Sequence, residues 1–215
     1  MNDLILQTSG STSIPKEISH SWEWLDYRIQ QTIDEIKLTD KDTVLDVFPA
    51  NVIAHYTVTA GVARKANARL ITTTFNPYNY CSLFNKYRPT YISLIPSHLK
   101  LLEASKEWKN LDMSCVRYMV TGSTQVSQEQ INSCLDKGVK LVANWYGLTE
   151  MPPPVFVGYN SEAFDFTPKK GYTLEFTDEG ELVINGFHTG DLFDLSTNKF
   201  LRRIKDVTNT NSWKS

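Results

Sequence analysis

Short β-branched runs alternate with amphipathic stretches between residues 43 and 147, and this alternation constrains the fold most. Strand-like runs occur at 43–49, 68–73, 91–96, 116–122 and 139–147. Helix-like stretches lie between them at 52–66, 79–87, 98–108 and 127–138. Strands and helices that alternate at this spacing form βαβ units, because parallel strands need a long crossover connection. The sequence therefore predicts an α/β fold whose mainly parallel sheet is flanked by helices.

The segments on either side of this alternation have different patterns. Before it, apolar residues recur at steps of three and four from Ile18 to Ile36, which predicts one further helix. After the three prolines at 152–154, the segment 172–186 is typical of a β-hairpin with its turn at 178–180. We therefore predict an α/β body at 1–150, a small β-rich C-terminal appendage at 151–206 and a polar tail at 207–215.

Charge and cysteine content argue against several classes of protein. With 22 Lys and Arg against 24 Asp and Glu, the net charge is -2, so no basic excess favours nucleic acid as a partner. The apolar runs are too short to cross a membrane, and no apolar leader precedes the first strand. Three separated cysteines without a Cys-x-x-Cys pair argue against a zinc site and predict a cytoplasmic protein with buried, inert thiols.

Three polar loops directly follow predicted strands. They are TSGSTSIPK at 8–16 after the apolar run LIL at 4–6, TGSTQ at 121–125 after VRYMV, and NWYGLTE at 144–150 after VKLVA. In an open parallel sheet, ligands bind beyond the carboxyl ends of the strands. The convergence of three such loops therefore predicts one ligand site at that edge.

The first loop has the chemistry of a phosphate site. Its hydroxyls and main-chain N–H groups can surround phosphate oxygens, and Lys16 can supply the opposite charge. It is not a Walker A loop, because Pro15 precedes this lysine and Glu17 follows it. A flexible leader rich in Ser and Gly is the alternative interpretation.

Two later segments could complete a nucleotide site. In NWYGLTE an aromatic ring beside a glycine can stack on a purine, and Glu150 can hold Mg²⁺, which prefers oxygen ligands. The alternative is a strand end with a capping Asn144 and a core Tyr146. In HTGDL, Asp191 can accept hydrogen bonds from ribose hydroxyls, although a plain β-turn aspartate is the simpler interpretation.

In this order, the segments resemble the motifs of the adenylate-forming (ANL) superfamily, which contains acyl-CoA synthetases, peptide-synthetase adenylation domains and luciferases. The phosphate-loop pattern T-S-G-S/T-T-G-x-P-K is matched at 8–16 except at Ser13, and N-x-Y-G-x-T-E is matched in full at 144–150. The G-E-L and T-G-D motifs resemble 180–182 and 189–191. TGSTQV at 121–126 is similar to the adenine-side glycine motif, with Ser123 in place of a glycine.

The resemblance implies a role for each matching residue. Those expected to hold the β- and γ-phosphates of ATP are Thr8, Ser9, Gly10, Ser11, Thr12 and Lys16. Those expected around the nucleoside are Gly122, Ser123, Thr124, Asn144, Tyr146, Gly147, Asp191 and Arg203. Thr149 would touch the α-phosphate, Glu150 would coordinate Mg²⁺, and His55 would lie near the acyl pocket. Lys16, Thr149, Glu150 and His55 are thus the expected catalytic residues.

Some parts that the family ordinarily has are expected to be missing from this chain. Only seven residues precede Thr8, and the chain ends near the family's hinge. The resemblance therefore implies a minimal member without the N-terminal portion and without the C-terminal domain that carries a catalytic lysine. Lys16, or a tail lysine such as Lys205 or Lys214, would have to replace that lysine.

Two functions remain open on the sequence. The first is a ligase that uses ATP and Mg²⁺ to convert a small carboxylic acid into acyl-AMP and pyrophosphate, with CoA or a carrier protein as a further acceptor. The second is a non-catalytic or partner-dependent nucleotide-binding protein of the same fold. We also predict a homodimer. The surface that the N-terminal portion covers in the family would be exposed in this chain, and a second copy could cover it.

Overall fold

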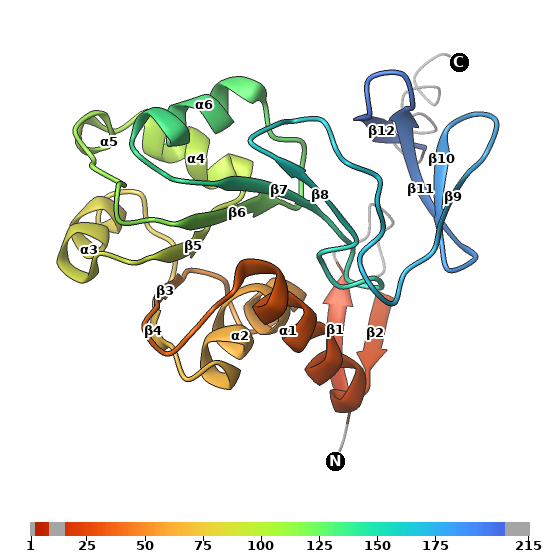
Figure 1. Ribbon diagram of the computed structural model, residues 1–215, viewed down its shortest axis with the longest axis horizontal. Coiled ribbons are helices and arrows are strands. Elements are labelled where there is room, and N and C mark those ends of the chain that lie inside the picture. The colour runs from red at the N-terminus through yellow and green to blue at the C-terminus, as the bar shows by residue number, and fades with distance from the viewer. Residues whose placement is uncertain (1–2, 9–15, 205–215) are drawn as a thin grey trace, which may run out of the picture.

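The computed structural model describes residues 3–8 and 16–204, and its main feature is a six-stranded sheet in the order β4-β3-β5-β6-β7-β8 (Figure 1). The strands from β3 to β7 run parallel, and β8 is antiparallel to β7. Their bounds are Thr43–Asp46 for β3, Arg69–Thr72 for β4, Tyr91–Ser93 for β5, Tyr118–Gly122 for β6, Val142–Tyr146 for β7 and Phe156–Tyr159 for β8. The predicted α/β class with a mainly parallel sheet is confirmed.

Helices cover both faces of this sheet (Figure 1). They are α1 at Trp22–Ile36, the π-helix η1 at His55–Thr59, α2 at Ala60–Lys65, α3 at Tyr80–Tyr87, α4 at Pro96–Glu103, α5 at Lys106–Lys109 and α6 at Gln128–Asp136. On one face, Ile29 of α1 and Val62 of α2 share a core cluster with Tyr91 of β5. On the other, Phe84 of α3 and Ile131 of α6 belong to a second cluster.

Two smaller antiparallel sheets complete the fold. β1 at Leu4–Thr8 pairs with β2 at Lys16–His20. The other sheet has the order β12-β11-β10-β9, with β9 at Leu174–Phe176, β10 at Glu181–Ile184, β11 at Phe187–Asp194 and β12 at Lys199–Arg203. Its inner side chains pack on Tyr146 and Phe156 of the larger sheet. The predicted small β-rich appendage is therefore present, while the domain limits at residues 150 and 206 stay a prediction.

The first helix begins later than the sequence predicts. Residues 16–20 pair with β1, so the assignment of Ile18 to the helix is wrong. Ser21 is the N-cap, and its side-chain oxygen accepts a hydrogen bond from the Trp24 N–H at 3.2 Å. Beyond this cap the predicted apolar stripe is confirmed by the burial of Leu25 and Ile29. A hydroxyl cap satisfies an otherwise unpaired N–H, which lets β2 lead directly into α1.

Two predicted helices are divided in the structure. The segment 52–66 becomes η1 followed by α2, and a Cβ added at Gly61 would lie 2.1 Å from the Tyr56 carbonyl oxygen. Only glycine fits so close to main chain. The segment 98–108 becomes α4 and α5, because Ser105 accepts a hydrogen bond from the Trp108 N–H and caps a new helix.

The predicted hairpin turn is confirmed. Gly180 N–H donates to the Thr177 carbonyl at 2.9 Å, and Gly180 has a φ of 82°, a left-handed conformation that glycine adopts without steric cost. β9 and β10 then pair in antiparallel register on either side of this turn.

Within residues 3–8 and 16–204, every helix is too short or too polar to cross a bilayer. Cys81 and Cys134 are buried free thiols, while Cys115 is only half-buried. Burial raises the pKa of Cys134 to about 12, so this thiol stays protonated and unreactive at neutral pH.

Candidate functional site

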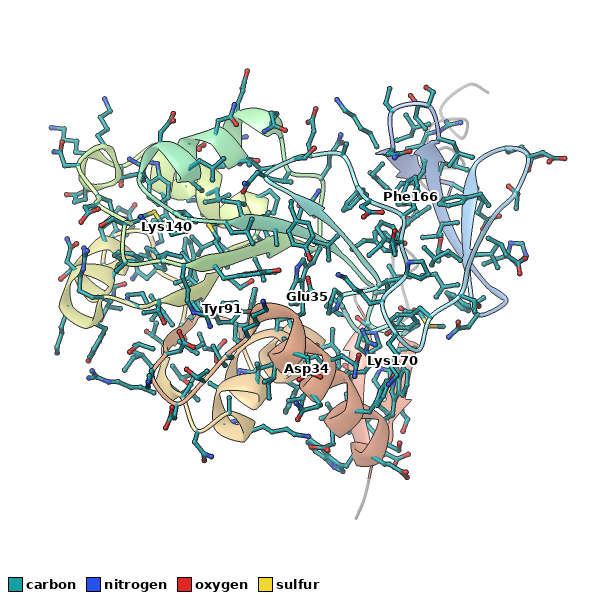
Figure 2. The ribbon with its side chains drawn as sticks, in the orientation of Figure 1. Asp34, Glu35, Tyr91, Lys140, Phe166 and Lys170 are labelled. Carbon is teal, nitrogen blue, oxygen red and sulfur yellow. The ribbon has the colours of Figure 1, made fainter. Side chains whose placement is uncertain are left out.

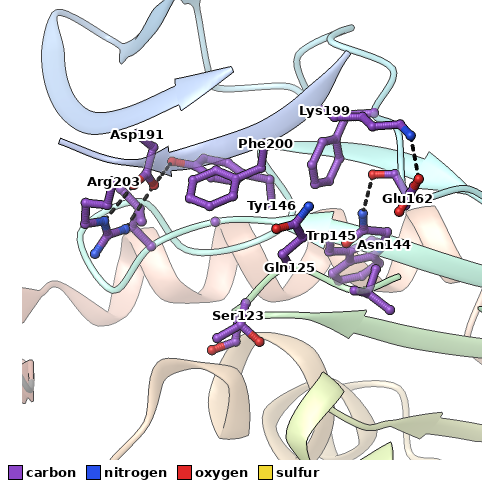
Figure 3. Close-up of a pocket in the computed structure, with 15 residues that line it drawn as sticks. Ser123, Gln125, Asn144, Trp145, Tyr146, Glu162, Asp191, Lys199, Phe200 and Arg203 are labelled. Carbon is purple, nitrogen blue, oxygen red and sulfur yellow. Dashed lines mark hydrogen bonds and ion pairs between the residues drawn. The ribbon is translucent and has the colours of Figure 1, made fainter. Parts of the chain in front are cut away.

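A pocket with about 600 Å³ of empty volume, part of it open to solvent, lies between the six-stranded sheet and the four-stranded sheet (Figure 3). One wall is formed by Ser123, Thr124 and Gln125, which follow β6, and by Asn144, Tyr146 and Gly147 at the end of β7. Asp191, Lys199, Phe200 and Arg203 of the small sheet form the opposite wall. The pocket thus lies at the carboxyl edge of parallel strands, where the sequence predicts a ligand site.

Asp191 joins the two walls at one end of the pocket. The residue is 1 % exposed, and its carboxylate accepts a hydrogen bond from the Tyr146 hydroxyl at 2.7 Å. The Arg203 guanidinium donates to both carboxylate oxygens, at 2.6 and 2.9 Å. Cross-strand pairing of Asp191 with Arg203 in β11 and β12 brings the two side chains together. Ribose hydroxyls that bound this carboxylate would therefore share it with Arg203.

Tyr146 is packed in an aromatic cluster. Its ring stacks on Phe156 with centroids 4.7 Å apart, and it meets Phe193 edge-on at 5.4 Å. Burial, and then the neighbouring Asp191 carboxylate, raise the pKa of the Tyr146 hydroxyl, which keeps it protonated as a donor. Phe156 covers one face of the Tyr146 ring, so a base could stack only on the opposite face. Stacking of a base on Tyr146 stays a prediction.

The opposite end of the pocket is polar. The Asn144 amide nitrogen donates to the Glu162 carbonyl at 3.2 Å, and Lys199 Nζ lies 2.5 Å from Glu162 Oε1 (Figure 3). The Lys199 hydrogen bond lowers the pKa of the Glu162 carboxyl. The sequence analysis missed both Glu162 and Lys199, which belong to no motif. Their position between the three prolines and the end of the small sheet offered no signal.

The loop after β6 contains two unusual backbone positions. A Cβ added at Gly122 would lie 2.3 Å from the Trp145 carbonyl oxygen, so the two parallel strands leave room only for glycine there. Ser123 has a φ of 72°, which L-residues other than glycine adopt at a cost of about 1–2 kcal/mol. Ser123 is also the position where the motif has glycine.

Thr149 and Glu150 lie in the turn after β7 and do not line the pocket. The turn is closed by a hydrogen bond from Leu148 N–H to the Met151 carbonyl at 2.9 Å. A Cβ added at Gly147 would lie 2.7 Å from Pro153 Cα, so the glycine is needed for the turn to fold back. Among the residues that the structure describes, no cluster of three His, Cys, Asp or Glu side chains could hold a metal. A single carboxylate such as Glu150 still fits Mg²⁺, since this ion usually takes most of its ligands from phosphates and water.

His55, the first residue of η1, is buried beside Asp46 of β3 and does not line the pocket. Its Nδ1 lies 2.8 Å from Asp46 Oδ2 and 3.2 Å from the Phe48 carbonyl oxygen. Asp46 is fully buried and accepts a hydrogen bond from the Thr59 hydroxyl at 2.6 Å. The sequence analysis missed Asp46, although a carboxylate in the apolar strand TVLDVFP was a signal.

The predicted phosphate loop lies largely outside the described residues. This applies to Ser9, Gly10, Ser11, Thr12 and Ser13, and also to Lys205 and Lys214 in the tail. Thr8 and Lys16 are the last paired residues of the β1–β2 hairpin, so their main chains flank that loop. Their expected contacts with phosphates stay predictions.

The structure therefore brings part of the predicted set to one pocket. The residues that line it are Ser123, Thr124, Asn144, Tyr146, Gly147, Asp191 and Arg203. The predicted His55, Gly122, Thr149 and Glu150 lie outside its lining.

Comparison with known proteins gives a family and a fold. The family model described as AMP-binding enzyme matches residues 4–184. The indoleacetate–CoA ligase of Aromatoleum aromaticum is 30% identical over 151 residues, which cover 70% of this chain and 29% of that protein. The feruloyl-CoA synthase of an Amycolatopsis species is 24% identical over 199 residues, covering 85% and 40%. The chain thus spans less than half the length of these relatives.

Solved structures share the fold. The N-terminal domain of FACL13 from Mycobacterium tuberculosis has a TM-score of 0.75 at 21% identity, over 94% of this chain and 60% of that one. The O-succinylbenzoate coenzyme A synthetase of Bacillus subtilis, solved with ATP and a magnesium ion, has a TM-score of 0.76 at 17% identity, over 94% and 50%.

Proposed function

This chain belongs to the AMP-binding enzyme family, and from that premise we propose that it binds ATP or AMP in the pocket between its two larger sheets. In the presence of Mg²⁺ it would activate a small carboxylic acid as acyl-AMP, with release of pyrophosphate. The observation that carries the proposal is the meeting of Ser123, Tyr146 and Asp191 around one pocket. These residues come from three separate motifs, and all three line the same pocket.

The contacts of the pocket support one orientation of the nucleoside. The buried carboxylate of Asp191 would accept hydrogen bonds from the ribose hydroxyls, while Arg203 supplies a positive charge beside it. The base would extend toward Asn144, whose amide nitrogen is already engaged by the Glu162 carbonyl. This engagement leaves the amide oxygen of Asn144 as an acceptor, which suits the exocyclic amino group of adenine.

The chemical step that we propose is attack of a carboxylate oxygen on the α-phosphorus of ATP. A new bond forms between the carboxylate oxygen and the α-phosphorus as the bond from that phosphorus to the pyrophosphate oxygen breaks. Pyrophosphate leaves with the electron pair of the broken bond. Lys16 and Thr149 would stabilise the charge on the phosphates, and Glu150 would hold the Mg²⁺ that adds further electrostatic stabilisation. Loss of one well-placed donor commonly lowers such a rate about 100- to 1000-fold.

A second candidate function is nucleotide binding without catalysis. It is favoured by one observation, namely that both oxygens of the Asp191 carboxylate already accept hydrogen bonds from this chain. A nucleotide must therefore share an existing ion pair, which supports weak or partner-dependent binding.

ATP–pyrophosphate exchange with a panel of aromatic and aliphatic carboxylic acids tests the proposal, alongside calorimetry with AMP and MgATP. Exchange that depends on the added acid and is lost in Glu150→Ala would support the ligase. Nucleotide binding without exchange for any acid would support the second function. Absence of binding, with Asp191→Asn indistinguishable from the parent, would refute both.

A further inference from the structure

The loop at 147–154, which follows β7, is held in place from outside the pocket. Its own main chain closes it at the base, where Val155 N–H donates to the Tyr146 carbonyl at 2.8 Å. Two side chains from the N-terminal part of the chain then contact carbonyl groups of the loop, at Thr149 and at Pro154. The first is His20 at the end of β2, and the second is Arg28 in α1. In the view of Figure 2, α1 lies below the larger sheet.

His20 contacts the loop at the residue that matters most for the proposed chemistry. It is 7 % exposed, and its Nε2 lies 2.6 Å from the Thr149 carbonyl oxygen. Because a carbonyl can only accept, Nε2 carries the proton and donates it. The peptide group is planar, so fixing this carbonyl oxygen also fixes the direction of the Glu150 N–H. His20 therefore sets the peptide that joins Thr149 to Glu150.

Arg28 holds the other end of the loop. Its side chain is fully buried, and its two terminal nitrogens donate to the Pro154 carbonyl at 2.6 Å and to the Lys170 carbonyl at 2.9 Å. The guanidinium also lies over the Tyr172 ring at 4.3 Å, and the Tyr172 hydroxyl donates to the Pro152 carbonyl at 2.7 Å.

The charge of Arg28 has no acidic partner within ion-pair distance among the described residues. Its Nε–H also lacks an acceptor in that part of the chain. Burial lowers the pKa of this guanidinium, yet an arginine remains charged at neutral pH. Stability alone would favour an apolar side chain here, because a buried charge without full compensation is costly. An apolar residue could not supply directed donors to the Pro154 carbonyl of the loop and to the Lys170 carbonyl.

We propose that His20 and Arg28 are positioning residues of the nucleotide site. Through main-chain carbonyls they fix the loop at 147–154, and with it the placement of Thr149 and Glu150 toward the phosphates. Neither residue lines the pocket, so neither touches the nucleoside. This inference rests on the proposed function, because that function assigns the two loop residues to the α-phosphate and Mg²⁺.

Binding of adenosine and of MgATP to the full chain separates positioning from general stability. Adenosine contacts the pocket without phosphates, whereas MgATP also engages the loop. In His20→Phe, which keeps a ring but removes the donor, we expect MgATP to bind about tenfold more weakly while adenosine affinity changes less than about twofold. His20→Gln places an N–H at a similar reach and should restore MgATP binding. His188→Phe, an exposed histidine of β11 away from the pocket lining, is the matched control.

Arg28→Met should weaken MgATP binding at least as much as His20→Phe does. Because removal of a buried cation can also unfold the protein, the His20 variants decide whether the positioning role holds. Equal losses for adenosine and MgATP, or no loss for either, in His20→Phe would refute the positioning role alone. A parent chain that binds neither ligand would refute the proposed function and this role together.

Discussion

Replacement of Asp191 by asparagine tests the centre of the proposed site. The substitution keeps the shape of the side chain and removes its charge. Hydrogen bonds to a charged group contribute about 1.5–3 kcal/mol, against about 0.5–1.5 kcal/mol for neutral pairs. Each ribose hydroxyl should thus lose about 1 kcal/mol, and two hydroxyls together should weaken AMP binding about 30-fold.

The same substitution should cost only modest stability. The Tyr146 hydroxyl can still donate to the amide oxygen, and the Arg203 side chain is 44% exposed, so it can be solvated when its partner loses charge. We therefore expect the free energy of unfolding of Asp191→Asn to fall by about 1–2 kcal/mol, which leaves the protein folded at 25 °C.

Calorimetry with AMP and with 2′,3′-dideoxy-AMP measures the effect. The dideoxy nucleotide lacks the hydroxyls, so its affinity should be nearly the same for the parent and for Asp191→Asn. Asp194→Asn is the matched control, because Asp194 lies in the same strand but caps a turn through Ser196 and Thr197 outside the pocket. If AMP bound Asp191→Asn within threefold of the parent, Asp191 would be a structural link between the sheets and not a ribose ligand.

Three further substitutions test the stability of the fold. Ser123→Gly relieves the left-handed backbone and should raise the free energy of unfolding by about 0.5–1 kcal/mol in urea titrations, whereas a loss would show that the serine side chain compensates for the strain. Burial lowers the pKa of His98, which stacks on Phe75, to about 4, so between pH 6.5 and 4 the unfolded chain binds a proton that the native chain does not. Stability should therefore fall by about 2 kcal/mol from pH 7 to pH 5, and His98→Phe should abolish that fall in thermal unfolding. Burial raises the pKa of Asp42, but hydrogen bonds, first of all from Arg117, lower it to about 2, so its contribution is present above pH 4 and is lost as the pH falls from 4 to 2. Asp42→Asn should destabilise the protein by about 1–2 kcal/mol at pH 7 and by much less at pH 2, and an equal loss at both values would contradict the assignment.

Much of the architecture was predictable because it depends on local patterns. The alternation from residue 43 to 147 predicted the parallel sheet, since buried parallel strands need continuous apolar runs and crossover helices. The hairpin turn ending at Gly180 was predictable for the same reason, because turn chemistry is local. Local pattern failed at Ile18, where a spacing that fits a helix was overridden by pairing with β1.

The sequence by itself determined which chemical groups could form a nucleotide site: the hydroxyl-rich loop, the N-x-Y-G-x-T-E segment and Asp191. Only the tertiary structure decided how these groups are engaged. The bond from Tyr146 to Asp191, the pair of Lys199 with Glu162 and the contact of His20 with Thr149 join residues that are 45, 37 and 129 positions apart. Such contacts follow from strand order and from the packing of one sheet on another, because chain spacing sets which side chains share a face and does not set which faces meet.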